Sequence, residues 1–482
     1  MKQLVYIIMS MVAYVVAVAP CRGAAERPNI VIIYADDLGY GDLGCFGGKN
    51  VVTPNLDRLA REGRKFTNFH VAQAVCSASR TALLTGCYPN RLGIHGALGP
   101  NANHGISDRE TTLAQLLKKQ GYATGMAGKW HLGHRPQFLP TRHGFDEYLG
   151  LPYSNDMWPH RPDGKKSTYP PLPLIEDEAI IDPDVTAEDQ ARLTSLYTTR
   201  AISFIEKHKK EPFFFYLAYA MPHVPLFVGE AFRGKSGHGL YADVVMEIDA
   251  SVGRILDILE ANHLADNTLV IFASDNGPWL NYGEHAGTSG PLREGKGTSW
   301  EGGVRVPCVM RWPAKLSAGS VCDAFLMTID LFPTIGRLVD AKMPNLPIDG
   351  RDVWPILAGT PGAKNPHEAY LFYYEVNQLQ AVASGDGHWK LMLPHEYRTL
   401  GGKPGGQGGV PGKYEQRTIV RPQLYDLRRD IAETMDVAEN NPEVVAHLLE
   451  SAEKARADLG DTITNRKGAG VRSAGQISDP PY

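Results

Sequence analysis

Residues 29–38 read Asn-Ile-Val-Ile-Ile-Tyr-Ala-Asp-Asp-Leu, an apolar run that ends in two adjacent carboxylates. Its β-branched and aromatic composition is typical of a strand buried on both faces of a parallel sheet. Phe213–Tyr219 and Thr268–Ala273 have the same character, and polar residues also follow each of them. The carboxyl ends of parallel strands meet at one edge of a sheet, where ligands bind. We therefore predict a functional site at that edge.

Helical signals lie between these strands. Thr53 and Pro54 are expected to be the N-cap and first residue of one helix, and Thr112–Lys119 carries leucines at helical spacing. Thr186 is expected to cap a long helix that extends toward Lys209, and apolar residues keep helical spacing between Tyr241 and Ala261. Strands that alternate with helices predict an α/β fold, in which a large, mostly parallel β-sheet is sandwiched by helices.

The sequence changes character after about residue 365. Residues 26–365 are expected to form the N-terminal catalytic domain, and residues 366–465 a smaller C-terminal α+β subdomain with a short antiparallel sheet. Gly401–Gly412 is rich in glycine, so it is either a mobile surface loop or a lid that faces the substrate. Residues 466–482 are expected to be a disordered tail. The elements predicted for the subdomain are strands at Tyr370–Tyr374, Gln380–Ala383, Trp389–Leu393 and Gln423–Leu427 and a helix at Pro442–Asp458.

Composition excludes several classes of protein. The 482 residues include 49 Lys and Arg against 53 Asp and Glu, for a formal net charge of −4. This charge does not fit a nucleic-acid-binding surface, so no nucleic-acid partner is expected. Hydrophobic residues at 43% and charged residues at 21% exclude a wholly disordered chain.

Residues 1–25 have the features of a signal peptide. Lys2 precedes an apolar run from Leu4 to Ala19, and Gly23-Ala24-Ala25 supplies small residues for cleavage. A secreted or periplasmic protein without a stable membrane span is therefore expected; a retained anchor helix is the alternative. Pro20 disfavours lipidation of Cys21. Removal of the leader would leave five cysteines, an odd number that needs an explanation.

Cys76-Ser-Ala-Ser-Arg80 opens a predicted helix. A cysteine at a helix N-terminus lies at the positive end of the helix dipole, and Arg80 is one turn away on the same face. On its own this pattern favours a buried structural thiol beside a surface arginine.

The residues around Cys76 decide between a structural thiol and a functional cysteine. Residues 76–86, Cys-Ser-Ala-Ser-Arg-Thr-Ala-Leu-Leu-Thr-Gly, resemble the signature of the sulfatase family, whose Cys-x-Pro/Ala-x-Arg motif directs conversion of the cysteine to formylglycine. Ala78 is the less common variant at its position. The resemblance implies an alkaline phosphatase-like fold. Four further motifs occur in the order of the family: Asn29–Leu38, Gly121–Gly133, Ser274–Gly277 and Gly295–Arg305.

Carboxylate and amide oxygens follow two of the predicted strands. Asp36 and Asp37 alone would fit a helix cap or a turn, but Asp275 and Asn276 follow a second strand end. Such hard oxygen ligands suit a divalent cation. The resemblance implies that these four residues, with the formylglycine oxygen at Cys76, hold Ca²⁺; Mg²⁺ fits less well because it prefers to keep its waters.

The resemblance also assigns roles to further polar residues. It implies that Lys129 binds the formylglycine and sulfate oxygens, that His131 contacts the formylglycine hydroxyl, and that His223 and Lys296 bind sulfate near the leaving oxygen. Ser154 matches a sulfate contact of arylsulfatases. Each of these residues on its own would fit an ordinary surface, core or loop position. Polar or aromatic residues on loops expected near the pocket are Asn103, His104, Trp158, His160, His395 and Arg398.

The resemblance implies a sulfuric-ester hydrolase of the arylsulfatase type, with Arg80, Lys129 and Lys296 offsetting charge on the transferring group. Its substrate would be an aryl sulfate or a sulfated carbohydrate, and a formylglycine-generating enzyme would be its maturation partner. The alternatives are a phosphodiesterase or phosphonate-ester hydrolase of the same superfamily and a non-catalytic protein that binds sulfated glycans. Conversion of Cys76 would leave four cysteines with three possible pairings: Cys45, Cys87, Cys308 and Cys322.

Overall fold

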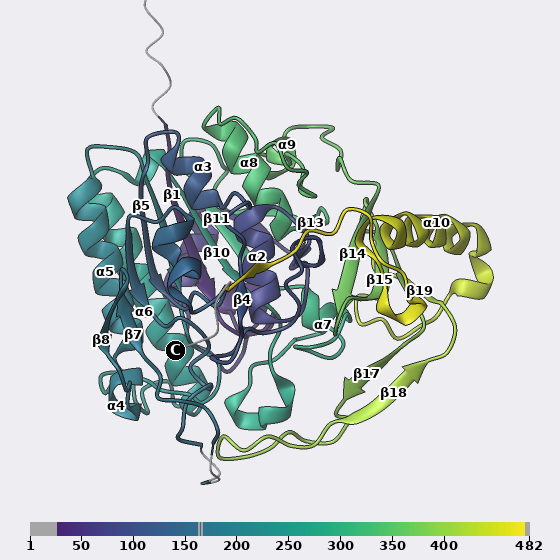
Figure 1. The fold of residues 1–482 in the computed structure, drawn as a ribbon, viewed down its shortest axis with the longest axis horizontal. Coiled ribbons are helices and arrows are strands. Elements are labelled where there is room, and N and C mark those ends of the chain that lie inside the picture. The colour runs from purple at the N-terminus through teal and green to yellow at the C-terminus, as the bar shows by residue number, and fades with distance from the viewer. Residues whose placement is uncertain (1–26, 162–163, 165–166, 478–482) are drawn as a thin grey trace, which may run out of the picture.

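The computed structural model describes residues 27–161, 164 and 167–477, so the predicted signal peptide lies outside the described residues. A ten-stranded sheet forms the centre of the larger part of the molecule (Figure 1). In sheet order its strands are β12 (Ser320–Cys322), β2 (Arg64–Phe66), β11 (Cys308–Arg311), β10 (Thr268–Ser274), β1 (Asn29–Ala35), β9 (Phe213–Ala218), β5 (Ala123–Gly128), β6 (Glu147–Gly150), β7 (Leu174–Glu176) and β8 (Ala179–Asp182).

The three predicted strands are neighbours at the centre of this sheet. β1 pairs in parallel with β10 on one side and with β9 on the other, and Ile32 lies opposite both Ile271 and Tyr216. β5 and β6 continue the parallel part, whereas β11, β2, β7 and β8 add antiparallel pairs toward the edges. The sheet is therefore mostly parallel, as predicted.

Side chains of β1 alternate between two hydrophobic cores. Ile30, Ile32 and Tyr34 belong to one core, and Val31 and Ile33 belong to the other. This alternation follows from the twofold side-chain period of a strand, and it leaves both faces of the sheet covered. The helices of the first face are α2 (Cys76–Thr85), α3 (Leu113–Lys118) and α8 (Leu331–Leu338), and those of the second are α1 (Pro54–Glu62), α5 (Leu193–His208) and α6 (Leu240–Ala261).

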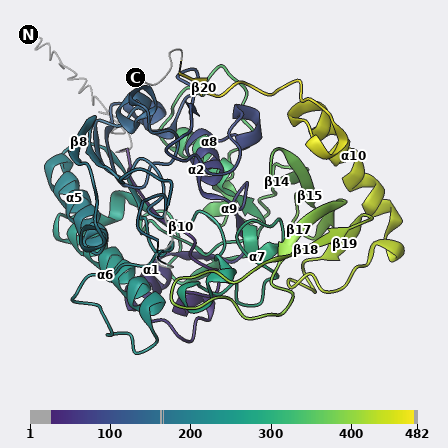
Figure 2. The same ribbon diagram turned by 60° about the horizontal axis from the view of Figure 1, so that its bottom comes forward.

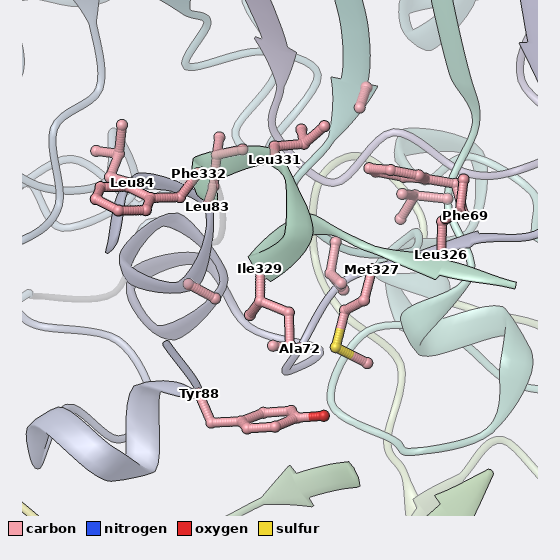
Figure 3. Packing of buried hydrophobic residues seen from close by; sticks show 14 of the residues in the cluster. Phe69, Ala72, Leu83, Leu84, Tyr88, Leu326, Met327, Ile329, Leu331 and Phe332 are labelled. Atoms are coloured by element: carbon pink, nitrogen blue, oxygen red, sulfur yellow. The ribbon is translucent and has the colours of Figure 1, made fainter. Parts of the chain in front are cut away.

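Helix α2 is buried along its whole length. Leu83 and Leu84 pack with Ile329, which lies just before α8, and with Leu331 and Phe332 at the start of α8 (Figure 3). Because a helix without a solvent-exposed face has little freedom to shift, the position of its first residue, Cys76, is set by the surrounding core.

A second, smaller sheet follows near the C-terminus and lies on the side of the molecule opposite α5 and α6 (Figure 2). Its strands are antiparallel, as predicted, and α10 packs on β14 and β15. The hairpin of β17 and β18, which flanks the glycine-rich loop, was not predicted. These elements are β14 (Ala369–Tyr374), β15 (Gln378–Ser384), β16 (Trp389–Met392), β19 (Gln423–Asp426), β17 (His395–Thr399), β18 (Glu415–Ile419) and α10 (Pro442–Leu459).

Two segments differ from the expectations. Thr186 caps only the short helix α4 (Ala187–Gln190), and α5 starts separately at Leu193. Residues 466–477, expected to be part of a disordered tail, return to the larger part of the molecule, where β20 (Gly475–Gln476) pairs with β4 (His104–Gly105). Two hydrogen bonds of 2.7 and 2.8 Å from Arg472 to Glu110 hold this segment in place.

Within the described ranges, no helix is both long enough and apolar enough to cross a membrane. The four cysteines left for pairing are free thiols: Cys45, Cys87, Cys308 and Cys322.

Candidate active site

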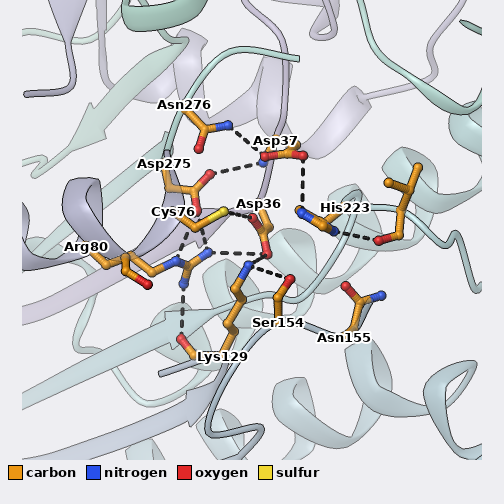
Figure 4. A network of polar contacts seen from close by, with 12 residues as sticks. Asp36, Asp37, Cys76, Arg80, Lys129, Ser154, Asn155, His223, Asp275 and Asn276 are labelled. Atoms are coloured by element: carbon orange, nitrogen blue, oxygen red, sulfur yellow. Dashed lines mark hydrogen bonds and ion pairs between the residues drawn. The ribbon is translucent and has the colours of Figure 1, made fainter. Parts of the chain in front are cut away.

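The polar residues that follow the central strands converge on the first residue of α2 (Figure 4). Cys76 is buried, and its Sγ lies 3.6 Å from Asp36 Oδ1 and 3.4 Å from Lys296 Nζ. Ligand atoms of Asp36, Asp37, Cys76 and His223 lie within 4.8 Å of one another. The carboxyl edge of the sheet thus brings together side chains that are far apart in the sequence.

The acidic residues are fixed by hydrogen bonds between the ends of β1 and β10. The backbone N–H of Asp37 donates to Asp275 Oδ1 at 3.1 Å, and Asn276 Nδ2 donates to Asp37 Oδ1 at 2.7 Å. Asp37 has a φ of 65°, a left-handed conformation that is uncommon outside glycine. A bend at the end of β1 therefore turns adjacent carboxylates toward the same site.

Three cations surround these carboxylates. Arg80 donates to Asp275 Oδ2 from Nε at 3.0 Å and from Nη2 at 2.8 Å. Lys129 Nζ donates to Asp36 Oδ2 at 2.6 Å and to Ser154 Oγ at 3.0 Å. Lys296 Nζ donates to both oxygens of Asp37, at 2.7 and 2.9 Å. Each buried positive charge thus has a carboxylate partner.

Lys129 reaches the site because β5 ends in a glycine. Gly128 has a φ of 117°, and a Cβ atom there would lie 1.7 Å from the carbonyl oxygen of Ala218 on β9. Only glycine allows this approach of the two strands. Lys129 then follows directly, and its backbone carbonyl accepts a hydrogen bond of 3.1 Å from Arg80 Nη1.

Two histidines complete the set. His223 Nδ1 donates a hydrogen bond of 2.6 Å to the Val224 carbonyl, and Nε2 of the same ring lies 3.6 Å from Asp37 Oδ2. His131 is buried with a φ of 63°, and among the described residues neither of its ring nitrogens has a hydrogen-bond partner. Burial lowers the pKa of His131 well below its usual value, with Lys129 and Arg80 lowering it further.

The charges of the site shift several other pKa values. Burial by itself would raise the pKa of Asp36, but Lys129, His223 and Arg80 hold it well below its usual range. Burial and the charge of Asp36 raise the pKa of Asp275 to about 7. Burial also raises the pKa of the Cys76 thiol to about 12, so the unmodified cysteine is a poor nucleophile at neutral pH.

The oxygen atoms at this edge fit a divalent cation. Asn276 Oδ1 is buried and has no hydrogen-bond partner among the described residues, which leaves an amide oxygen available as a ligand. Asp36 and Asp37 add carboxylate oxygens beside it, and oxygen donors of this kind suit Ca²⁺ and Mg²⁺. One oxygen of Asp275 is already occupied by Arg80.

Trp279 was not predicted as a site residue, although it lies three residues after Asn276. Its ring centroid is 4.4 Å from Lys296 Nζ and 5.5 Å from the ring of His223. Arg398 was expected only as a polar loop residue, but it lies on β17, and its Nη2 donates to the backbone carbonyl of Lys296 at 2.6 Å. An aromatic residue a few positions after a polar strand end was the available signal for Trp279.

A mostly parallel α/β sheet with carboxylates, lysines and a buried cysteine at its carboxyl edge has the architecture of the alkaline phosphatase-like superfamily. Comparison with known proteins narrows this class. The sequence profile described as "Sulfatase" matches residues 28–341, and that described as "C-terminal region of aryl-sulfatase" matches residues 365–473. The profile described as "N-sulphoglucosamine sulphohydrolase, C-terminal" matches residues 295–393.

Individual proteins agree with these profiles. Arylsulfatase A of Bos taurus is 38% identical over 461 residues, which cover 91% of this chain and 89% of the relative. N-acetylgalactosamine-6-sulfatase of Homo sapiens is 40% identical over 380 residues, which cover 75% of this chain and 71% of the relative. A solved structure from a study of glycosaminoglycan metabolism by Bacteroides thetaiotaomicron matches with a TM-score of 0.76 and 30% identity, covering 90% of this chain and all of that one.

The chain therefore belongs to the sulfatase family. It is an enzyme that hydrolyses sulfuric esters.

Proposed function

We propose that this sulfatase uses residue 76, after oxidation of the cysteine to formylglycine, as its nucleophile. The observation that carries this proposal is the position of Cys76 at the start of a buried helix, with Lys296 Nζ 3.4 Å and Asp36 Oδ1 3.6 Å from its sulfur. A thiol whose pKa burial raises to about 12 is unsuited to attack, whereas an aldehyde hydrate at the same place carries two hydroxyl groups.

A divalent cation, Ca²⁺ in preference to Mg²⁺, completes the proposed site. When bound, such a cation polarises the sulfate oxygens and lowers the pKa of a neighbouring hydroxyl. The unpartnered oxygen of Asn276 and the cluster of carboxylates support this assignment. The proposed ligands are the oxygen atom at residue 76 and the side chains of Asp36, Asp37, Asp275 and Asn276.

In the first step, one hydroxyl of the hydrate loses its proton to water and attacks sulfur, and the bond between sulfur and the ester oxygen breaks. His223 or Lys296 donates a proton to the departing oxygen, which leaves as an alcohol. Arg80, Lys129 and Lys296 offset negative charge on the transferring group, and Ser154, hydrogen-bonded to Lys129, contacts the sulfate.

In the second step, His131 accepts the proton of the other hydroxyl. The carbon–oxygen bond to the sulfate then breaks, sulfate leaves, and the aldehyde forms again for hydration by water. Neither ring nitrogen of His131 has a hydrogen-bond partner among the described residues, which supports this role, since a free nitrogen is required to accept the proton. A serine in place of formylglycine would form a sulfate ester with the enzyme, and a water molecule would have to attack that ester to release sulfate.

The biological setting belongs to the same proposal. The substrate is a sulfated glycan or an aryl sulfate, consistent with the carbohydrate named in N-acetylgalactosamine-6-sulfatase. Residues 1–25 direct export of the protein to the cell exterior or periplasm. A formylglycine-generating enzyme converts Cys76 by acting on the segment around it. Residues 26–365 act as the catalytic domain and residues 366–465 as the smaller subdomain.

The experiment compares matched aryl sulfate and aryl phosphate esters with the purified protein and with Cys76→Ala. We expect hydrolysis of the sulfate to dominate and to be abolished in the variant, while the circular dichroism spectrum is unchanged. Preferential hydrolysis of the phosphate would favour a phosphodiesterase or phosphonate-ester hydrolase. Inactivity of formylglycine-bearing protein on a broad panel of sulfate esters would favour a non-catalytic glycan-binding protein.

A further inference from the structure

A cavity of about 240 Å³ lies beside the proposed site, lined in part by residues that follow His223 in the sequence or contact Lys296. Val224 and Pro225, directly after His223, form part of its wall. Trp279 forms another part, and the same ring approaches Lys296 Nζ at 4.4 Å and the His223 ring at 5.5 Å. The group attached to the departing oxygen would therefore extend into this cavity.

Aromatic side chains form much of the cavity wall. Trp279 packs against Tyr282 with ring centroids 4.9 Å apart at 66°, and Trp158 packs against Phe227 at 5.6 Å. Tyr169 also faces the cavity. Rings that pack edge to face hold one another in place, so they present fixed apolar surfaces on which a flat ligand can rest.

Polar groups lie among these rings. Asp156, His160 and Arg161 also line the cavity. Asp156 Oδ1 and Trp279 Nε1 are buried, and neither atom has a hydrogen-bond partner in the described part of the chain. One is an acceptor and the other a donor, and hydroxyl groups of a ligand can serve both.

Part of the glycine-rich loop closes the cavity. Gly409, Val410 and Pro411 line it, and the loop is tied to the segment after Trp279 through Asn281. The Asn281 carbonyl accepts hydrogen bonds from the backbone N–H groups of Gly406 at 2.8 Å and Gly412 at 2.6 Å. Of the two interpretations of this loop, the structure supports the one in which it faces the substrate.

We propose that this cavity binds one sugar ring whose hydroxyl carries the sulfate ester, a proposal that rests on the function proposed above. The volume is below the roughly 300–1,000 Å³ typical of sites for drug-sized ligands, so it suits a single ring. A sugar offers C–H faces to the aromatic walls and hydroxyls to Asp156 and Trp279. A simple aryl group would leave these buried polar atoms unpaired.

The experiment measures kcat/KM for a panel of hexose and N-acetylhexosamine monosulfates and for 4-nitrophenyl sulfate. We expect at least one sugar sulfate to be the better substrate. In Asp156→Ala and in Trp279→Phe, which keeps the ring but removes the N–H, the ratio of sugar to aryl kcat/KM should fall about tenfold, as expected when one buried polar group loses its partner. Asp266→Asn, exposed at the opposite end of β10, serves as the control and should leave the ratio unchanged.

Other results would overturn either the sugar site or the sulfatase mechanism. Turnover of the aryl ester without turnover of any sugar sulfate would overturn the sugar site and leave the sulfatase mechanism intact. An unchanged ratio in Trp279→Phe would also overturn the sugar site, even if Asp156→Ala failed to fold. Absence of turnover of every ester by formylglycine-bearing protein would overturn the proposed mechanism and, with it, the sugar site.

Discussion

Lys296 Nζ lies 3.4 Å from Cys76 Sγ, although 220 residues separate them in the sequence. The same ammonium group donates to both oxygens of Asp37 and lies over the ring of Trp279. Lys296 therefore connects the nucleophile position, the proposed cation ligands and the wall of the sugar cavity. Its charge is kept because Asp37 offsets the effect of burial, which alone would lower the pKa of the lysine.

Replacement of Lys296 should impair the chemical step. In Lys296→Met we expect kcat to fall about 10²–10³-fold, because a preorganised charge beside the transferring sulfate is lost. Steady-state kinetics on an aryl sulfate provides the measurement. Lys315→Met, an exposed lysine after β11, should retain full activity. A normal kcat for Lys296→Met would exclude Lys296 from the reaction.

Arg398 is expected to act as a positioning residue for Lys296. It donates to the Lys296 carbonyl, and its guanidinium lies 4.9 Å over the ring of Tyr414. A Cβ atom at Gly297 would lie 1.9 Å from Arg398 Nη2, so the arginine fills the space beside this glycine. In Arg398→Ala we expect kcat to fall about tenfold or more through misplacement of Lys296, with a smaller change in KM.

The test of Arg398 needs variants that separate positioning from folding. Arg398→Lys keeps a donor for the carbonyl and should recover part of the lost kcat. Arg417→Ala, on the neighbouring strand β18 but exposed, should behave like the unmodified enzyme. Loss of thermal stability in Arg398→Ala without any change in kcat would instead assign this residue a purely structural role.

Removal of divalent cations should reduce both activity and stability. Asp36 and Asp37 are buried close together, and Asn276 Oδ1 has no hydrogen-bond partner in the part of the chain that the structure describes. After dialysis against a chelator we expect activity to be lost and the unfolding temperature to fall, with Ca²⁺ restoring both better than Mg²⁺. Asn276→Ala should weaken the affinity for Ca²⁺ in calorimetric titration. An enzyme that stays fully active without any divalent cation would contradict the assigned site.

A buried charge cluster around Lys390 should make stability depend on pH. Lys390 Nζ on β16 lies 2.8 Å from Glu301 and 3.0 Å from Glu433. Burial raises the pKa of Glu433 to about 7 from an ordinary value of 4.5. The folded state therefore binds this proton more tightly than the unfolded state, so the contribution of Glu433 to stability is greatest below pH 4.5 and is lost as pH rises toward 7.

Glu433→Gln removes this titration. Chemical unfolding measures the free energy of unfolding of the variant and of the unmodified protein. The difference should shift in favour of the variant as pH rises from 5 to 7.5, by about 1.4 kcal/mol for each unit by which the pKa of Glu433 in the folded state exceeds that in the unfolded state. Glu439→Gln, an exposed neighbour, should show no such trend. A stability difference that is constant with pH would mean that Glu433 does not titrate in this range.

The central strands and the residues after them could be predicted because the signals are local. An unbroken apolar run specifies a buried strand, and polar residues at its end specify the site edge. Thr112 with Gln115 is a similar case, since its capping box depends on four consecutive residues. The five motifs of the sulfatase family identify the same site residues without any prediction of secondary structure.

Other features depend on contacts between distant segments. Thr53 was expected to cap α1, but its side chain makes no cap hydrogen bond, and Asp249 of α6 accepts the N–H groups of Asn55 and Leu56 instead. The cavity likewise combines Asp156, Trp279 and the loop around Val410, which have no common pattern in the sequence. Tertiary packing alone brings such residues together.

The most direct test of the central claim is mass spectrometry of the tryptic peptide Phe66–Arg80 from active, exported protein. The account predicts formylglycine or its hydrate at residue 76. An unmodified cysteine in protein that turns over sulfate esters would contradict it.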